Sequence, residues 1–70
     1  MQITIMQITI NGERKNITSP TVAALVEELK LDTRKLAVEH NRSIVPRSLY
    51  TKTALHEGDA VEIVQFIGGG

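Results

Sequence analysis

The chain has 70 residues, with eight basic and eight acidic side chains and no cysteine. This length makes one small domain with a thin core, which buries only about 60% of its unfolded surface. The charges lack the basic footprint of a nucleic-acid binder, no apolar run approaches the ~20 residues that span a bilayer, and the start does not resemble a signal peptide. Without cysteine there are no disulfides, thiolate metal sites or cysteine nucleophiles. The sequence therefore predicts a cytoplasmic protein that binds neither nucleic acid nor membrane.

The chain begins with an exact repeat, MQITI followed by MQITI. Side chains of a strand alternate between faces with a period of two, so an odd offset turns the isoleucines of one copy away from the face used by the other. Only one copy then fits a core. We interpret Met6 as the true start of the domain and residues 1–5 as a duplicated start outside the core. The alternative is a longer first strand that contains a bulge.

Residues 6–18 are predicted to form a β-hairpin. Apolar and polar side chains alternate over residues 6–10, as in a half-buried strand. Asn11-Gly12 is a strong signal for a tight hairpin turn, because both residues tolerate a positive φ. The polar residues 13–18 then supply the returning strand.

One amphipathic helix is predicted to follow. Ser19 is the expected N-cap and Pro20 the first helical residue, where the missing N–H of proline costs nothing. Apolar side chains then recur at helical spacing, at Val22, Leu25, Val26 and Leu29. A domain this small must bury that stripe, so we expect the helix to pack across one sheet face and not to bind a partner.

The second half of the chain is predicted to alternate strands and turns. Residues 36–40 form a strand that turns at Asn41-Arg42 into residues 43–46, since asparagine tolerates positive φ. Residues 47–53 are irregular or form a single helical turn, and residues 57–59 form a turn before the last strand. The order ββ, α, ββ and a terminal β indicates an α+β domain with a mixed sheet.

No constellation for catalysis or metal binding is apparent. His40 and His56 have no further ligand-type residue at a suitable spacing, so both are expected on the surface and no metal site is predicted. Glu27 and Glu28 diverge by ~100° on the helix, which makes them a solvated face and not a carboxylate pair. The serines lack a glycine elbow, and no phosphate-binding loop occurs.

The last strand, predicted from residue 61, presents two different faces. Glu62 is expected in solvent, so Val61 and Ile63 should point toward the helix. Val64 and Phe66, with Ile67 beyond them, are then predicted to form a docking surface for partners. The alternatives are a central strand that is buried on both faces, or exposed hydrophobic side chains without a function.

The last strand changes directly into Gly68-Gly69-Gly70. Without Cβ, this tail can enter a narrow channel, and its terminal carbonyl carbon is unhindered. The α-carboxylate of Gly70, with an ordinary pKa of roughly 3.5, is the candidate reactive group. The alternative is a frayed end or a linker remnant.

Two stretches resemble a known family. Residues 57–70 (EGDAVEIVQFIGGG) are similar to the carboxyl-terminal signature of the ThiS family, the sulfur carriers of thiamin biosynthesis, and residues 41–47 (NRSIVPR) match a second stretch of that family. The resemblance covers nearly everything from Met6 onward. It implies a ubiquitin-like β-grasp domain over residues 6–70 with a flexible glycine tail at 68–70. In this fold the first and last strands lie side by side at the sheet centre.

The resemblance also implies a carrier without catalytic residues of its own. An E1-like enzyme would join AMP from ATP to the carboxylate of Gly70, and a persulfide would displace the AMP. The resulting thiocarboxylate would then deliver sulfur to thiazole synthase. ATP and magnesium would belong to the activating partner, and this chain would bind no cofactor. The alternatives are the small subunit of molybdopterin synthase, a ubiquitin-like protein modifier, and an interaction module with an inert tail; Val45-Pro46-Arg47 and the glycine ending favour the thiazole branch.

Overall fold

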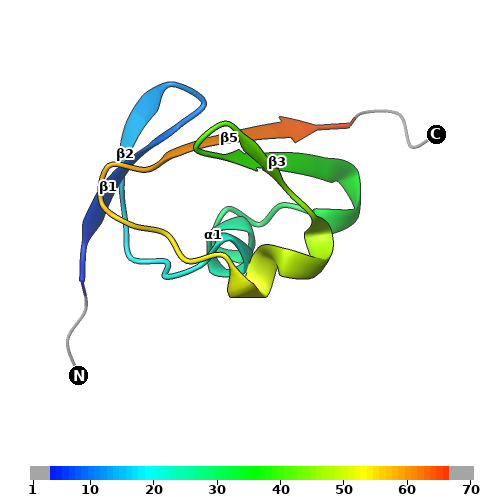
Figure 1. Cartoon of the computed structure of the whole chain (residues 1–70), viewed down its shortest axis with the longest axis horizontal. Helices are drawn as coiled ribbons and strands as arrows, with labels where there is room; N and C mark the ends of the chain where they lie inside the picture. Colours follow the sequence, from blue (N-terminus) through cyan, green and yellow to red (C-terminus); the bar gives the residue numbers. More distant parts are fainter. Residues whose placement is uncertain (1–3, 67–70) are drawn as a thin grey trace.

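Two β-hairpins flank one central strand in a mixed sheet (Figure 1). The first hairpin contains β1 (Met6–Ile10) and β2 (Glu13–Ile17), and the second contains β3 (Leu36–His40) and β4 (Ser43–Val45). Between them β5 (Ala60–Gln65) runs parallel to β1 and antiparallel to β3, which gives the order β2-β1-β5-β3-β4. The computed structural model describes residues 4–66. Because β5 pairs with β1, the first and last strands lie side by side, as predicted.

Both hairpin turns are built on asparagine. Asn11 and Gly12 have φ of 52° and 83°, and Asn41 and Arg42 have φ of 51° and 71°. Positive φ at both central residues defines a turn whose twist matches that of the flanking strands. Both predicted turns are thus confirmed, although the second places an arginine in the left-handed region that usually favours glycine.

The helix α1 (Val22–Glu28) begins later than the sequence indicated. Thr21, not Ser19, is the N-cap, and its Oγ1 accepts a hydrogen bond from the Ala24 N–H at 3.2 Å. Thr21 is extended because it forms a β-bridge with Ala54. The prediction of Ser19 as N-cap is therefore wrong, since a pairing with a segment distant in sequence delays the helix.

Ser19 instead lies buried beneath the other end of the helix. Its hydroxyl donates a hydrogen bond to the carboxylate of Glu28. The sequence predicts that Glu28 forms part of a solvated face with Glu27. Glu28 is exposed as a residue, but its carboxylate makes this specific contact, which ties the segment before the helix to its last turn.

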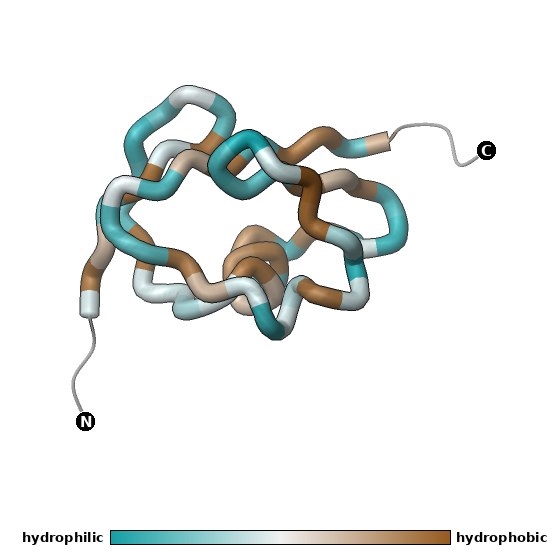
Figure 2. The backbone as a smooth tube through the Cα atoms, viewed as in Figure 1, coloured by the Kyte–Doolittle hydropathy of each residue, from teal (hydrophilic) through white to brown (hydrophobic). Residues whose placement is uncertain are grey.

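The core lies between α1 and one face of the sheet. Figure 2 shows hydrophobic residues running through the helix and alternating with hydrophilic ones along the strands. Val22, Leu25 and Val26 of the predicted stripe are at most 1% exposed, whereas Leu29 is 41% exposed. Leu29 is the C-cap, after which Lys30 adopts a φ of 59° and ends the helix.

Short 3₁₀ segments complete the connections. One, η1 (Thr33–Lys35), precedes β3, and the other, η2 (Arg47–Lys52), packs against α1 between β4 and β5. The second agrees with the helical turn predicted for this region. Tyr50 of η2 is buried, and this burial raises the pKa of its phenol against the opposing charge of Arg47.

At the amino-terminal side, β1 begins at Met6. Thr4 and Ile5 precede the strand, and Ile5 is 67% exposed. Residues 1–3 lie outside the described residues, so the interpretation of residues 1–5 as a duplicated start stays a prediction. Across residues 4–66 no helix is long and apolar enough to cross a membrane.

Candidate functional site

The two faces of β5 differ as its sequence predicts. Val61 and Ile63 are 1% and 9% exposed and belong to the core. Val64 and Phe66 are 58% and 57% exposed on the opposite face. The predicted orientation of these side chains is thus confirmed, and the alternative of a strand buried on both faces is wrong.

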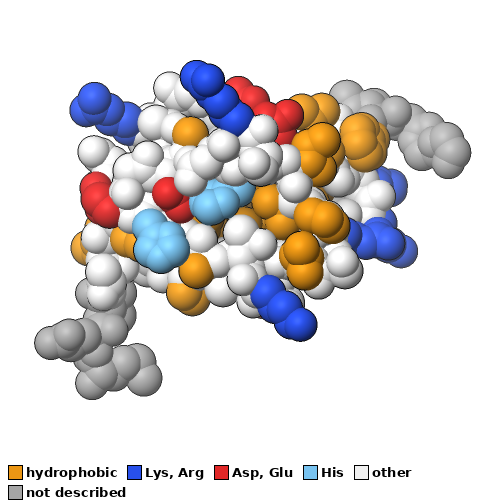
Figure 3. All heavy atoms as spheres, in the orientation of Figure 1, with side chains coloured by type: hydrophobic (Ala, Val, Ile, Leu, Met, Phe, Trp, Pro, Cys, Tyr) orange, Lys and Arg blue, Asp and Glu red, His pale blue; other side chains and the backbone are white. Residues whose placement is uncertain are grey.

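The exposed apolar surface extends beyond β5. Ala37 of β3 is the register partner of Val64, and Ile44 of β4, which is 75% exposed, pairs with the neighbouring Glu39. Figure 3 shows hydrophobic side chains gathered on the side of the molecule where β5 ends. We call Ala37, Ile44, Val64 and Phe66 the outer apolar patch. Ile44 is not among the residues predicted for the docking surface, although its alternation with the buried Val45 could have revealed it.

The same sheet face becomes acidic toward the start of β5. Glu39 and Glu62 lie directly opposite each other in the β3–β5 register. Together with Arg42 they line a shallow depression of about 300 Å³. Like charges placed opposite each other on neighbouring strands destabilise a sheet, so this pair does not serve the stability of the fold.

The last residues of β5 are held by pairing with β3 and with the residue before it. Gln65 is in register with Leu36, and the Phe66 N–H donates to the Lys35 carbonyl oxygen at 2.7 Å. The predicted partner-binding residue Ile67 and the predicted tail Gly68-Gly69-Gly70 lie outside the described residues. Their roles stay predictions.

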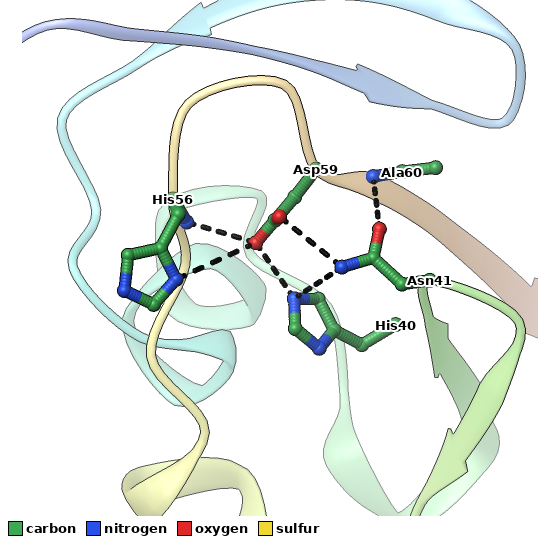
Figure 4. Close-up of polar contacts among 5 residues, drawn as sticks. All are labelled: His40, Asn41, His56, Asp59 and Ala60. Carbon is green, nitrogen blue, oxygen red and sulfur yellow. Dashed lines mark hydrogen bonds and ion pairs between the residues drawn. The ribbon is translucent and has the colours of Figure 1, made fainter.

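A polar cluster anchors the opposite end of β5 (Figure 4). The carboxylate of Asp59 lies 2.7 Å from Nε2 of His40 and accepts hydrogen bonds from the His56 backbone N–H at 2.8 Å and from Asn41 Nδ2 at 3.1 Å. Asn41 Oδ1 in turn accepts from the Ala60 N–H at 2.8 Å. Burial raises the pKa of the Asp59 carboxyl, but the hydrogen bonds from His40, His56 and Asn41 outweigh it and lower the pKa below its ordinary value.

This cluster corrects one expectation for the histidines. The His40 side chain is only 20% exposed because it faces Asp59, whereas that of His56 is 76% exposed, as expected. The contact joins residues 19 positions apart, and no local pattern in the sequence indicates it. Within residues 4–66, no three histidine or carboxylate side chains are grouped so that they could hold a metal ion.

Comparison with known proteins identifies the family of this chain. The family model described as the ThiS family matches residues 8–70. The chain belongs to the ThiS family. The crystal structure of the thiamine biosynthesis protein (ThiS) from Geobacter metallireducens is similar to this ThiS-family chain with a TM-score of 0.79 and 32% identity, covering 93% of this chain and 100% of that one. The predicted β-grasp fold is thereby confirmed.

Several relatives of this ThiS-family chain carry functional names. The sulfur carrier protein ThiS of Bacillus subtilis is 34% identical over 50 residues, which cover 71% of this chain and 76% of that protein. The thiazole synthase of Paramagnetospirillum magneticum is 54% identical over 66 residues, which cover 93% of this chain. This chain spans only 20% of the length of that synthase.

Proposed function

We propose that the chain is a sulfur carrier for thiazole formation in thiamin biosynthesis and that its reactive group is the carboxylate of Gly70. Membership in the ThiS family supports the pathway. The observation that carries the proposal is the position of β5. This strand is paired with β1 at its start and with β3 up to its end, it buries Val61 and Ile63, and in sequence it leads into the glycine tail. A fixed strand of this kind presents a reactive terminus from a defined point of the molecule.

The chemistry follows from the poor reactivity of a carboxylate. Its oxygen must first become a good leaving group, which attack on the α-phosphorus of ATP achieves by forming an acyl adenylate and releasing pyrophosphate. A persulfide sulfur then attacks the carbonyl carbon and displaces AMP. Reduction of the remaining S–S bond by a thiol frees the thiocarboxylate. We assign the ATP, the magnesium and the catalytic groups to an E1-like enzyme and none of them to this chain, which works as a cosubstrate in the cytoplasm.

The outer apolar patch is proposed as the docking surface for the activating enzyme and for thiazole synthase. It lies on the last residues of β5 and on the neighbouring strands β3 and β4, and four extended residues from 67 to 70 reach at most about 14 Å. A partner that binds the tail in its active site must therefore also contact the surface from which the tail leaves. Val64 and Phe66, together with the predicted Ile67, are nearest to that exit in sequence.

The thiazole branch is favoured over the molybdopterin alternative by one relative. The Paramagnetospirillum magneticum protein named thiazole synthase contains, within one polypeptide, a segment 54% identical to nearly all of this chain. That segment makes up 20% of its length, so carrier-like and further sequence are joined there. We infer that the carrier and the synthase act on the same sulfur atom.

Intact mass spectrometry tests the proposal. The mass of the purified protein first establishes whether Gly70 is its last residue. After incubation with ATP, magnesium, a sulfur source and the cognate E1-like enzyme, we expect a mass increase that matches the exchange of one oxygen for sulfur. Fragment ions should place the change on Gly70. Incubation of cell extract with the tagged protein should yield no lysine conjugates, which a protein modifier would form.

Two variants provide the matched controls. Deletion of Gly70, or addition of one residue after it, should abolish the mass change while the unfolding curve stays that of the native chain. An extended variant that gains sulfur without being trimmed contradicts the assignment to Gly70. A normal chain that stays unmodified with every component present contradicts the sulfur-carrier function.

A further inference from the structure

The ladder between β1 and β5 is shorter than β5 itself. Only Thr9 with Ala60 and Ile10 with Val61 are in register, whereas β5 continues to Gln65. After Ile10 the chain turns away into the Asn11-Gly12 hairpin. The side of β5 that faces β1 would therefore lose its hydrogen-bond partners from Ile63 onward.

The side chain of Asn11 takes the place of the missing strand residue. The backbone N–H of Asn11 donates to the Val61 carbonyl oxygen at 2.9 Å, which continues the ladder. Its Oδ1 accepts from the Ile63 N–H at 2.8 Å, and its Nδ2 donates to the Ile63 carbonyl oxygen at 3.2 Å. A primary amide offers the same donor and acceptor as a peptide group, so Asn11 pairs with Ile63 as a further residue of β1 would.

The turn by itself does not require this contact. A turn with two positive φ values accepts glycine, aspartate or asparagine at its first central position. Glycine has no side chain, and an ionised aspartate can accept from the Ile63 N–H but cannot donate to its carbonyl oxygen. Among the usual turn residues only asparagine satisfies both groups of Ile63.

Beyond Ile63 the strand is held from one side. Gln65 and Phe66 are paired with the β3 side, through the Leu36 register and the 2.7 Å bond to the Lys35 carbonyl oxygen. Within residues 4–66 no hydrogen bond reaches the Gln65 backbone from the β1 side. Among the described residues, the bidentate contact of Asn11 is thus the last attachment of β5 on that side.

We propose that Asn11 is a positioning residue for the carboxyl-terminal tail. By holding Ile63 on its second side, it fixes the course of Gln65 and Phe66 at the end of β5 and so presents Gly70 to the activating enzyme. This proposal rests on the sulfur-carrier function proposed above. Productive geometry in an active site is sensitive to displacements of about 1 Å, which can cost about 100-fold in rate.

Asn41 offers a matched control in the same molecule. It occupies the same position of the second hairpin turn, with nearly the same φ, and also binds β5 through its side chain. Its Oδ1 accepts from the Ala60 N–H, at the start of β5 and far from the exit of the tail. Asn11→Gly and Asn41→Gly each keep the turn. Asn11→Gly removes the two side-chain hydrogen bonds to Ile63, whereas Asn41→Gly removes those to Ala60 and to Asp59, at the start of β5.

The experiment compares these two variants and Asn11→Asp in the full chain, at a temperature well below all three unfolding midpoints. Adenylation by the activating enzyme is measured against carrier concentration, and ¹⁵N relaxation of the Gln65 and Phe66 amides is measured in the free carrier. For Asn11→Gly we expect a loss of roughly 10-fold or more in kcat/KM for adenylation and lower order parameters at both amides. The kcat/KM of Asn11→Asp should lie between the values of the native chain and of Asn11→Gly. The kcat/KM of Asn41→Gly should stay within about 2-fold of the native value.

The outcomes separate the two proposals. Equal rate losses in Asn11→Gly and Asn41→Gly would assign Asn11 a structural role only, and an unchanged rate in Asn11→Gly overturns the proposal outright. If the native chain itself is not adenylated, the sulfur-carrier function fails. The positioning role is tested separately by relaxation: unchanged order parameters of the Gln65 and Phe66 amides in Asn11→Gly overturn it. Should Asn11→Gly not fold, the same readouts on Asn11→Asp decide.

Discussion

The imidazole of His40 and the carboxylate of Asp59 meet with 2.7 Å between Nε2 and Oδ2, and this contact joins the end of β3 to the residue before β5. The hydrogen bonds to Asp59 lower its pKa below the ordinary value, despite burial. The unfolded chain then binds a proton more readily than the folded one. The stability that Asp59 contributes is therefore present above about pH 4 and is lost as the pH falls through the folded pKa.

We expect Asp59→Asn to lower the free energy of unfolding at neutral pH by about 1–3 kcal/mol, because donors that converge on the carboxylate lose an acceptor. The variant should also lose less stability than the native chain between pH 5 and 2, which urea unfolding curves across that range measure. An acid dependence identical to that of the native chain would show that Asp59 titrates normally.

Asp32 provides the control for this measurement. Hydrogen bonds from Arg34 lower the pKa of its carboxyl to about 2, so it also contributes to the acid dependence. Its ion pair with Arg34 is exposed, however, and exposed charges are largely screened in about 1 M salt. We expect the effect of Asp32→Asn on the acid dependence to become smaller at high salt, whereas that of Asp59→Asn should change less.

The start of the helix supplies a second prediction. Thr21→Ala should lower the free energy of unfolding by about 1 kcal/mol, because the Ala24 N–H loses its cap. Ser19 should instead be energetically coupled to Glu28, since their side chains share a hydrogen bond. A double-mutant cycle with Ser19→Ala and Glu28→Ala should give a coupling of about 1 kcal/mol, while Thr21→Ala and Glu28→Ala should be additive. If Thr21 were coupled to Glu28 and Ser19 were not, our assignment of Thr21 as the N-cap and of Ser19 as the partner of Glu28 would be wrong.

The difference between Ser19 and Thr21 shows what could be predicted from the sequence. The strands were predicted from the alternation of apolar and polar side chains, and the turns from Asn11 and Asn41, which are local properties. The buried and exposed faces of β5 were predicted from the position of Glu62. The N-cap depended on the β-bridge between Thr21 and Ala54, and the environment of His40 depended on the pairing of β3 with β5. Such contacts between distant segments leave no periodic pattern in the chain.

The candidate site was predictable to a similar extent. Val64 and Phe66 were found because β5 alternates strictly around Glu62. Asn11 was identified as a turn residue, but its bond to Ile63 depends on where β1 stops relative to β5. Strand register is set by tertiary packing as well as by turn geometry, so the sequence pattern alone did not define this contact.

Phe66 tests the docking surface. Its side chain is 57% exposed, so Phe66→Ala should change the free energy of unfolding by less than about 1 kcal/mol. Truncation of a central interface aromatic commonly costs about 2 kcal/mol or more of binding, and we expect a loss of this size in calorimetric titration against the activating enzyme. Ile63→Ala is the control on the buried face, where about 2–5 kcal/mol of stability should be lost. A Phe66 variant that unfolds readily yet binds normally would place this residue in the core.

The last prediction concerns the duplicated start. The strand β1 begins at Met6, and Ile5 is largely exposed. A chain that starts at Met6 retains the whole of β1 and every residue that pairs with β2 and β5. We therefore expect its free energy of unfolding to agree with that of the full chain within about 1 kcal/mol in urea titration.

The same truncation has a second expected effect. A short apolar segment of high β-propensity can pair with the exposed edge of another molecule, and β2 and β4 form the edges of this sheet. Any self-association that depends on residues 1–5 should disappear from sedimentation profiles of the truncated chain. Replacing residues 1–5 by a polar segment of equal length distinguishes loss of a β-prone sequence from loss of length. A truncation that costs several kcal/mol would mean that the first copy belongs to the folded core and that the domain begins at Met1.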